Sequence, residues 1–196
     1  MIKNPKKIVI SRTDSIGDVV LTLPLAGILK GRFPTATIIF LGNTYTKPII
    51  QCCEAIDEIW EWAEIEKKQP KEQLQWFTEQ KVDTFIHVFP RKAIARLAKK
   101  AKIANRIGTS HRTFHWLTCN YRPSFTRKGS DKHEAQLNTR LLEPLRISAD
   151  YSLNQLFDHI AFTKIPELPT KFSELLIGNK KNVILHVKSQ GSAVEW

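Results

Sequence analysis

Asp18 is the residue whose position is best suited to chemistry. It stands beside Gly17 in the stretch ISRTDSIGDVVLTLP (10–24), where a hydrophobic strand leads through a polar turn into an apolar helix. A carboxylate there could act as a general base that takes a proton from an attacking hydroxyl. It could also stabilise the helix by about 0.3–1 kcal/mol, because an acid in the first turn complements the helix dipole. Position alone favours the stabilising role and leaves the catalytic role open.

The glycine of this turn permits a tight bend and a close approach of the backbone to a ligand. The turn does not have the G-x-G-x-x-G spacing of a dinucleotide site. No Gly-Lys-Ser/Thr follows it, as it would in a Walker phosphate loop. The sequence therefore does not indicate a bound dinucleotide or a nucleoside triphosphate at this turn.

Positive charge is concentrated in one segment, residues 91–132. The chain of 196 residues has 30 Lys and Arg against 19 Asp and Glu, a net charge of +11. This segment contains twelve Lys and Arg and one acid, Asp131, so its excess of 12 − 1 = +11 equals that of the whole chain. A solvated face usually mixes both signs. The segment is therefore predicted to face an anion, which the arginine fork binds in bidentate fashion.

Aromatic residues are interleaved with these charges, at Phe114, Trp116, Tyr121 and Phe125. This mixture suits single-stranded RNA, whose bases stack on aromatic rings. It equally suits a negatively charged, lipid-anchored acceptor at a membrane surface. Composition does not separate the two partners, although the sequence contains no RNA-recognition motif.

The cysteines and histidines do not predict a metal site. Cys52, Cys53 and Cys119 are an odd number without paired spacing, which is typical of a reducing cytoplasm without a disulfide framework. The adjacent pair could hold a soft metal, but packing as small hydrophobic residues is the favoured interpretation. His111 and His115 are four residues apart and have no third ligand nearby in the sequence. The chain also has no apolar run long enough for a transmembrane helix, and its start does not have the pattern of a signal peptide.

Strands alternate with helices over the first 108 residues, which predicts an α/β fold with a parallel sheet. The expected strands are Lys7–Ser11, Ala36–Leu41, Glu58–Trp62, Val82–Phe89 and Asn105–Gly108. The expected helices are Asp18–Arg32, Tyr45–Cys53, Lys71–Gln80, Arg91–Lys102 and, later in the chain, His133–Leu145. Ligands of such sheets bind at the carboxyl ends of the strands. This rule places the turn Arg12–Asp18 and the residues Pro90–Lys92 on the same active edge.

The remaining segments predict the start of a second domain. Residues 109–132 are expected to form a long loop, and 165–169 a stiff proline linker. A short helix Lys171–Ile177, a buried strand Asn182–Val187 and a glycine turn at 188–192 follow. A strand and a turn cannot form a domain by themselves. We therefore predict an N-terminal domain over 1–164 and the beginning of a truncated C-terminal domain over 165–196.

Four stretches, in order, resemble the family 9 glycosyltransferases, which are the ADP-heptose:lipopolysaccharide heptosyltransferases. They are ISRTDSIGDVVLTLPLAGILKGRFPTATIIFL (10–41), ANRIG (104–108), HEAQLNTRLLEPLRI (133–147) and VILHVKSQGSAVEW (183–196). The resemblance implies a GT-B fold, in which two Rossmann-like domains face each other across a cleft. It also implies that the N-terminal domain binds the acceptor and the C-terminal domain binds the nucleotide-sugar.

The resemblance implies roles for particular residues. Asp18 would be the catalytic base of a single inverting displacement that needs no metal. The acceptor-binding candidates are Arg12, Ser15, Gly17, Arg91, Lys92, Arg112 and Arg122, with Arg127 and Lys128 as weaker ones. The donor-phosphate candidates are Lys188, Ser189, Gly191 and Ser192. Val194 departs from the family, because many members have a Lys two residues before the Trp that aligns with Trp196. This departure leaves Lys188 as the cation for the donor.

The predicted function is therefore transfer of a heptose or related sugar from a nucleotide-sugar, ADP-heptose, to a lipopolysaccharide inner-core acceptor. The expected partners are the anionic lipid-linked acceptor, the donor and an anionic membrane surface. No nucleic acid and no separate cofactor are expected, and the predicted location is the cytoplasmic face of the inner membrane. Two alternatives stay open, an acceptor-binding half-enzyme that is catalytically incomplete and a basic RNA-binding module.

Overall fold

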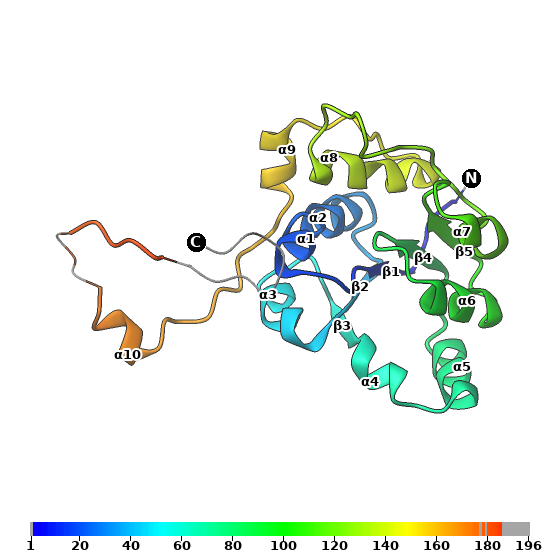
Figure 1. The fold of residues 1–196 in the computed structure, drawn as a ribbon, viewed down its shortest axis with the longest axis horizontal. Helices are drawn as coiled ribbons and strands as arrows, with labels where there is room; N and C mark the ends of the chain where they lie inside the picture. The colour runs from blue at the N-terminus through cyan, green and yellow to red at the C-terminus, as the bar shows by residue number, and fades with distance from the viewer. Residues whose placement is uncertain (1, 177, 179, 186–196) are drawn as a thin grey trace. The chain divides into compact units, whose positions relative to one another are not determined.

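A computed structural model describes residues 2–176, 178 and 180–185, and the chain divides into two units, Met1–Lys164 and Ile165–Trp196. The first unit is built on one sheet of five parallel strands in the order β3-β2-β1-β4-β5 (Figure 1). The strands are β1 Lys7–Ser11, β2 Thr37–Gly42, β3 Glu58–Glu61, β4 Thr84–His87 and β5 Asn105–Gly108. This order is that of a Rossmann-like domain, so the fold-class prediction is confirmed.

The strand register brings distant segments together at the carboxyl edge of the sheet. Ser11, the last residue of β1, pairs with Leu41 of β2 on one side and with His87 of β4 on the other. His87 in turn pairs with Gly108 at the end of β5. The order of the strands reverses between β1 and β4, and ligands of open α/β sheets bind at such a reversal. The segments that follow β1, β4 and β5 are therefore expected to form the ligand-binding site.

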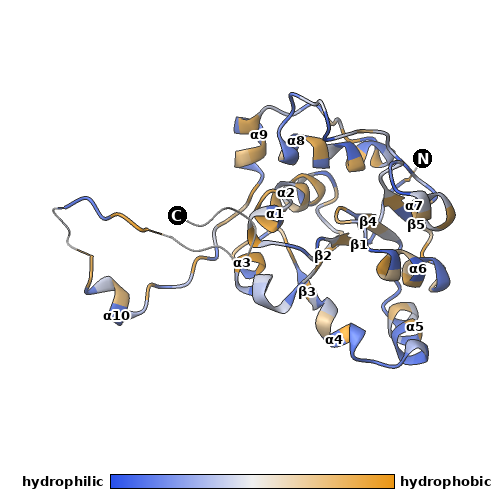
Figure 2. Cartoon of the chain, in the orientation of Figure 1, coloured by the Kyte–Doolittle hydropathy of each residue, from blue (hydrophilic) through white to orange (hydrophobic). Residues whose placement is uncertain are grey.

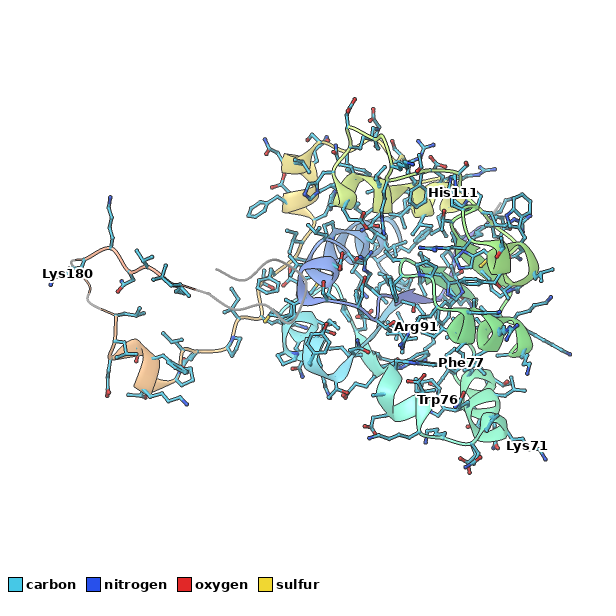
Figure 3. The ribbon with its side chains drawn as sticks, in the orientation of Figure 1. Lys71, Trp76, Phe77, Arg91, His111 and Lys180 are labelled. Carbon is cyan, nitrogen blue, oxygen red and sulfur yellow. The ribbon has the colours of Figure 1, made fainter. Side chains whose placement is uncertain are left out.

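Helices cover both faces of the sheet, as the continuous hydrophobic strands require (Figures 1 and 2). One face packs Ile10 and Phe40 against a first group of helices. This group is α1 Ile16–Val20, α2 Leu23–Arg32, α8 Glu134–Thr139, the 3₁₀ helix η2 Arg140–Leu145 and α9 Leu153–Asp158. The other face packs Val9 and Phe85 against α4 Trp62–Glu66, α5 Pro70–Glu79 and α6 Lys92–Lys100. Trp76 and Phe77 of α5, labelled in Figure 3, have ring centroids 5.5 Å apart in this second core.

The predicted single helix Asp18–Arg32 is two helices, α1 and α2. The first begins earlier than expected, because Ser15 caps it by accepting a hydrogen bond from the Asp18 amide at 3.5 Å. The second begins at Leu23, with Pro24 in its first turn. Proline has no N–H group to continue a helix but suits the first turn of a new one. This break fixes α1 as a short helix at the end of β1.

Proline also explains two further differences from the predicted helices. The helix expected over Tyr45–Cys53 is a 3₁₀ turn, η1 Thr44–Thr46, followed by α3 Lys47–Gln51, which has Pro48 in its first turn. The helix expected over His133–Leu145 is α8 followed by η2, and Pro144 lies inside η2. Three short helices were not predicted, namely α4, α9 and α7 Thr113–Thr118, the last of which lies in the expected loop 109–132.

The second unit contains a short helix, α10 Thr170–Ser173, which ends before the predicted Ile177. The buried strand predicted over Asn182–Val187 is wrong in its described part. Residues 182–185 form no strand, and Val183, Ile184 and Leu185 are exposed. A strand needs a neighbour to pair its backbone groups, and the described part of this unit provides none. The roles of the two units as acceptor-binding and donor-binding domains stay predictions.

Two glycines of α2 make a matched pair for testing how the segment at the end of α9 packs on α2. A Cβ added at Gly27 would lie 2.0 Å from the His159 carbonyl oxygen, whereas a Cβ added at Gly31 would meet no atom within 4 Å. We expect Gly27→Ala to lower the free energy of unfolding by about 1–3 kcal/mol, because the backbone beyond α9 must move. We expect Gly31→Ala to raise it by about 0.5–1 kcal/mol through helix propensity. Urea unfolding of both variants measures the difference, and equal effects would contradict this packing.

Candidate functional site

Arg12 is the centre of the turn that follows β1. Its side chain is 1% exposed and donates to three carboxylates. Nε donates to Asp14 at 2.7 Å, Nη2 donates to Asp18 at 2.5 Å, and Nη1 donates to Glu134 at 3.3 Å. Glu134 is the first residue of α8, so the guanidinium joins the turn of β1 to a helix 122 residues away in the sequence.

Asp18 is held in one orientation but stays accessible. Its Oδ1 accepts from Arg12, and its Oδ2 accepts from the Ser15 hydroxyl at 2.6 Å. The side chain is 36% exposed. A carboxylate has about four lone-pair positions, so two hydrogen bonds leave it able to accept another donor. This geometry suits a base that receives a proton from an incoming hydroxyl.

The neighbouring groups give this turn a negative character. Burial raises the pKa of the Asp14 carboxyl, and the Arg12 charge and hydrogen bond oppose this rise. The Tyr45 hydroxyl donates to the Asp14 carbonyl oxygen at 2.6 Å. Burial raises the pKa of Tyr45 as well, with further contributions from the charges of Asp14 and Asp18. The Tyr45 side chain therefore stays neutral and serves as a hydrogen-bond donor to the turn.

A cavity of about 300 Å³ lies at the ends of β4 and β5. Its lining is basic and partly apolar, and consists of His87, Val88, Pro90, Thr109, His111, Arg112, Phe125, Thr126, Arg127 and Lys128. We call it the basic cavity. Arg127 also contacts Glu134, the residue that contacts Arg12. The basic cavity and the Asp18 turn are thus joined through Arg127, Glu134 and Arg12.

Comparison with solved structures shows which known proteins have a similar arrangement of strands. A family 9 glycosyltransferase from Veillonella parvula matches with a TM-score of 0.56 and 23% identity, over 74% of this chain and 44% of that one. The Escherichia coli heptosyltransferase WaaC with ADP matches with a TM-score of 0.60 and 16% identity, over 74% of this chain and 49% of that one. The chain has the fold of the family 9 glycosyltransferases. The sequence resemblance is therefore confirmed at the level of the fold.

A curated relative agrees with this assignment. A Haemophilus influenzae protein named "Putative glycosyltransferase" is 28% identical over 138 residues, which cover 70% of this chain and 40% of that protein. No protein-family model matches the chain. The chain thus spans half or less of the length of these family 9 structures and of this relative. No helix in the described ranges has the length and apolar character needed to cross a membrane.

Within the family 9 fold, the acceptor-binding candidates occupy different places. Arg112 lines the basic cavity, and so do the weaker candidates Arg127 and Lys128. Arg91 and Lys92, at the start of α6, do not line it. Figure 3 shows Arg91 well apart from His111, which is a residue of the cavity wall.

Arg12 and Arg122 have structural roles that the sequence did not indicate, and the backbone at Gly17 differs from the expected bend. The Arg12 guanidinium is engaged by three carboxylates, as described above. Arg122 lies over the Trp116 ring at 4.9 Å and donates to the Cys119 carbonyl oxygen. Gly17 lies inside α1 without a positive φ, so the tight bend predicted for it is wrong. A Cβ at Gly17 would meet no atom within 4 Å, and a close approach by a ligand therefore stays a prediction.

The donor-phosphate candidates Lys188, Ser189, Gly191 and Ser192 lie outside the described residues, as do His186, Val194 and Trp196. Glu134 is a site residue that the sequence reasoning missed. The available signal was its place in HEAQLN, where an acid follows a helix-capping residue at the start of a family motif. That signal places Glu134 at a helix start and does not reveal Arg12 as its partner.

His87 and His115 form a buried pair beneath the basic cavity. Their ring centroids are 5.6 Å apart, and the His115 Nδ1 is 2.9 Å from the Thr109 carbonyl oxygen. Among the described residues, both His87 nitrogens and the His115 Nε2 have no hydrogen-bond partner. Burial, followed by the charges of His115 and Arg106, lowers the pKa of His87 well below its ordinary value. Burial also lowers the pKa of His115.

These lowered pKa values make stability fall in acid. Below about pH 6.5 the unfolded chain binds protons that the folded chain excludes, so the free energy of unfolding decreases as the pH falls. We expect each histidine to add up to about 1.4 kcal/mol per pH unit to this slope. Urea unfolding between pH 7 and pH 5 measures it. We expect His87→Leu to flatten the slope, and an unchanged slope in His87→Leu would contradict the assignment.

The cysteines are free and buried in the described residues, and no group of three or more His, Cys, Asp or Glu there is arranged to hold a metal. Cys52 and Cys53 donate instead to the carbonyl oxygens of Pro48 and Ile160, each at 3.3 Å. Burial raises the pKa of Cys119 to about 11 and also raises that of Cys53. A thiol with a raised pKa is a poor metal ligand at neutral pH, because the ligand must lose its proton.

Proposed function

We propose that this chain is the acceptor-binding part of a family 9 glycosyltransferase that transfers a heptose or a closely related sugar from ADP-heptose to a lipopolysaccharide inner-core acceptor. The observation that carries the proposal is the Asp18 carboxylate. It is oriented by Arg12 and Ser15, is 36% exposed, and lies where the strand order of the sheet reverses.

The chemistry at Asp18 would be general-base catalysis of one displacement. The acceptor hydroxyl gives its proton to the carboxylate while its oxygen forms a bond to the anomeric carbon of the donor sugar. The bond from that carbon to the diphosphate breaks at the same time, and the configuration inverts. Arg12 holds the carboxylate in place, because an ion pair with a buried guanidinium restricts its rotation.

The cations of residues 91–132 would hold the negative groups of the acceptor. Arg91 and Lys92 follow β4, and Arg112 follows β5, so all three lie near the carboxyl edge of the sheet. The acceptor is anchored in a membrane, and the net charge of +11 would draw the protein to the anionic inner face of that membrane. The solved neighbours WaaC with ADP and WaaC with ADP-2-deoxy-2-fluoro heptose support a nucleotide-sugar donor.

A transfer assay tests this function directly. A form of the protein that carries a donor-binding domain is incubated with ADP-heptose and a lipopolysaccharide acceptor that has no heptose. The product is analysed by mass spectrometry and by the anomeric configuration of the new linkage. We expect one added heptose with inverted configuration. A retained configuration would exclude the single displacement, and transfer of another sugar in its place would exclude heptose.

A second candidate is a half-enzyme that binds the acceptor and catalyses nothing by itself. It is favoured by the coverage of the solved neighbours, since the chain matches only 39–53% of their length. Calorimetry of the 196-residue chain with ADP tests this second candidate. A half-enzyme is expected to bind no ADP, whereas tight binding would exclude it.

A further inference from the structure

The outer face of α6 is basic and contains no acidic residue. Arg96, Lys99 and Lys100 are exposed, whereas Ile94 and Leu97 are buried in the second core. The helix sequence KAIARLAKK has no Asp or Glu, and none of the three cations forms an ion pair with a described residue. A solvent-exposed helix face usually alternates positive and negative charges. A face with one sign of charge is therefore suited to contact with an anionic surface.

Helix α7 adds two exposed apolar side chains beside this face. The Lys99 ammonium donates to the Leu117 carbonyl oxygen at 2.7 Å, so the two helices are in contact, and Figure 1 shows them side by side. Trp116 and Leu117 are 61% and 74% exposed. The Trp116 indole is held in place, because its Nε1 donates to the Ser110 carbonyl oxygen at 2.9 Å. We call the set Arg96, Lys99, Lys100, Trp116 and Leu117 the α6–α7 surface.

The α6–α7 surface fits an anionic bilayer better than it fits RNA. Tryptophan is favoured at the level of lipid head groups, an aliphatic side chain gains free energy when it leaves water for acyl chains, and cations are attracted to anionic lipids. RNA binding instead depends on aromatic faces on which bases stack. One face of the Trp116 ring is covered by the Arg122 guanidinium, 4.9 Å from the ring centroid, and Leu117 offers no ring for stacking.

We propose that the α6–α7 surface docks the protein on an anionic phospholipid bilayer, with Trp116 and Leu117 inserted among the head groups and the α6 cations against the lipid phosphates. This inference rests on the proposed function, in which the acceptor is anchored in a membrane, and adds the surface that contacts the membrane. The location is consistent with that function. Helix α6 begins directly after β4, and α7 begins beside Arg112 of the basic cavity, so both helices start at the carboxyl edge of the sheet.

Sedimentation with vesicles tests the cations of this surface on the 196-residue chain, at about 0.1 M salt, which screens charges beyond about 10 Å. We expect binding to vesicles of phosphatidylglycerol and phosphatidylethanolamine and much weaker binding to phosphatidylcholine. Arg96→Ala and Lys100→Ala should each weaken binding to the anionic vesicles about fivefold. Arg32→Ala is the matched control, because Arg32 is exposed at the end of α2, which packs on the other face of the sheet. It should bind like the unaltered chain.

A second pair of variants tests the apolar contact. Leu117→Ser should weaken binding several-fold, because it removes the inserted side chain and keeps the carbonyl oxygen that Lys99 contacts. Phe157→Ser is the matched control, because Phe157 is 73% exposed on α9, which packs on the other face of the sheet. We expect Phe157→Ser to bind unchanged, and thermal unfolding verifies that all variants fold.

Trp116 provides a signature that charge attraction alone does not produce. We expect the tryptophan emission to shift to shorter wavelength on anionic vesicles, because the exposed indole moves from water into the head-group region. Trp116→Phe should lose this shift and still bind, since an apolar ring remains at the surface. An unchanged shift in Trp116→Phe would overturn the insertion of this residue.

The remaining outcomes are equally decisive. Equal losses in Arg96→Ala and Arg32→Ala, or in Leu117→Ser and Phe157→Ser, would overturn the α6–α7 surface. Binding of single-stranded RNA that depends on Arg96, without binding to the anionic vesicles, would overturn the membrane as the partner. These measurements involve neither Asp18 nor sugar transfer, so their failure is distinct from failure of the proposed function.

Discussion

Replacing Asp18 with Asn is expected to lower the turnover of sugar transfer by about 10²–10⁴-fold, the range for loss of a general base. Asn has the same shape and can still accept from Arg12 through its single amide oxygen, while its NH2 group can donate to the Ser15 hydroxyl. Its amide cannot take up the acceptor's proton at neutral pH. Binding of the acceptor should change much less than turnover. The assay measures initial rates of heptose transfer in a form of the protein that carries a donor-binding domain.

Asp14→Asn is the matched control for this experiment. Asp14 contacts Arg12 at 2.7 Å, as Asp18 does at 2.5 Å, so each substitution removes one negative charge from the same cluster. If Asp18 is the base, Asp14→Asn should retain most of the turnover. Equal losses in the two variants would mean that charge balance around Arg12 matters and that proton transfer to Asp18 does not. Full turnover in Asp18→Asn would remove Asp18 from the base role.

Much of this fold is determined by local patterns that the sequence displays. The continuous hydrophobic runs around Val9, Ile39 and Phe85 become buried parallel strands, because both faces of the sheet are covered by helices. The alternation of strands and helices places the Arg12–Asp18 turn at the carboxyl edge. The breaks at Pro24 and Pro48 follow from the missing N–H group of proline, and at each of them one predicted helix is divided in two.

The site is less predictable, because its contacts join residues far apart in the sequence. Arg12 has the sequence context of an exposed ligand-binding residue, but it is buried by Glu134, which is 122 residues away. The basic cavity likewise needs the ends of β4 and β5 and the loop at 125–128 together. No periodicity or spacing encodes such a meeting of segments. Charge counting indicated residues 91–132 as a whole and did not separate Arg112, which lines the cavity, from Arg122, which lies against Trp116.

Replacing Arg12 with Met is expected to have the second large effect, a loss of stability. Methionine fills a similar volume but leaves Asp14, Asp18 and Glu134 facing one another without the buried cation. Removing one partner of a buried ion pair costs about 3–5 kcal/mol, because the charges that remain are uncompensated. We expect a loss of that order in the free energy of unfolding at pH 7, measured in urea. Arg12→Lys should lose less than Arg12→Met, since a single ammonium retains the charge but cannot bond all three carboxylates.

A control and a rescue make the Arg12 result specific. Lys30 pairs with Asp57 at 2.8 Å where both side chains are about one-third exposed, so Lys30→Met should cost only about 0.2–1 kcal/mol. Adding Asp14→Asn to Arg12→Met should restore part of the lost stability, because it removes one of the two carboxylates left without a cation, whereas Glu134 keeps its contact with Arg127. If Arg12→Met cost no more than Lys30→Met, the cluster would not hold the turn. The orientation of Asp18 would then need another cause, because Ser15 alone fixes only one of its oxygens.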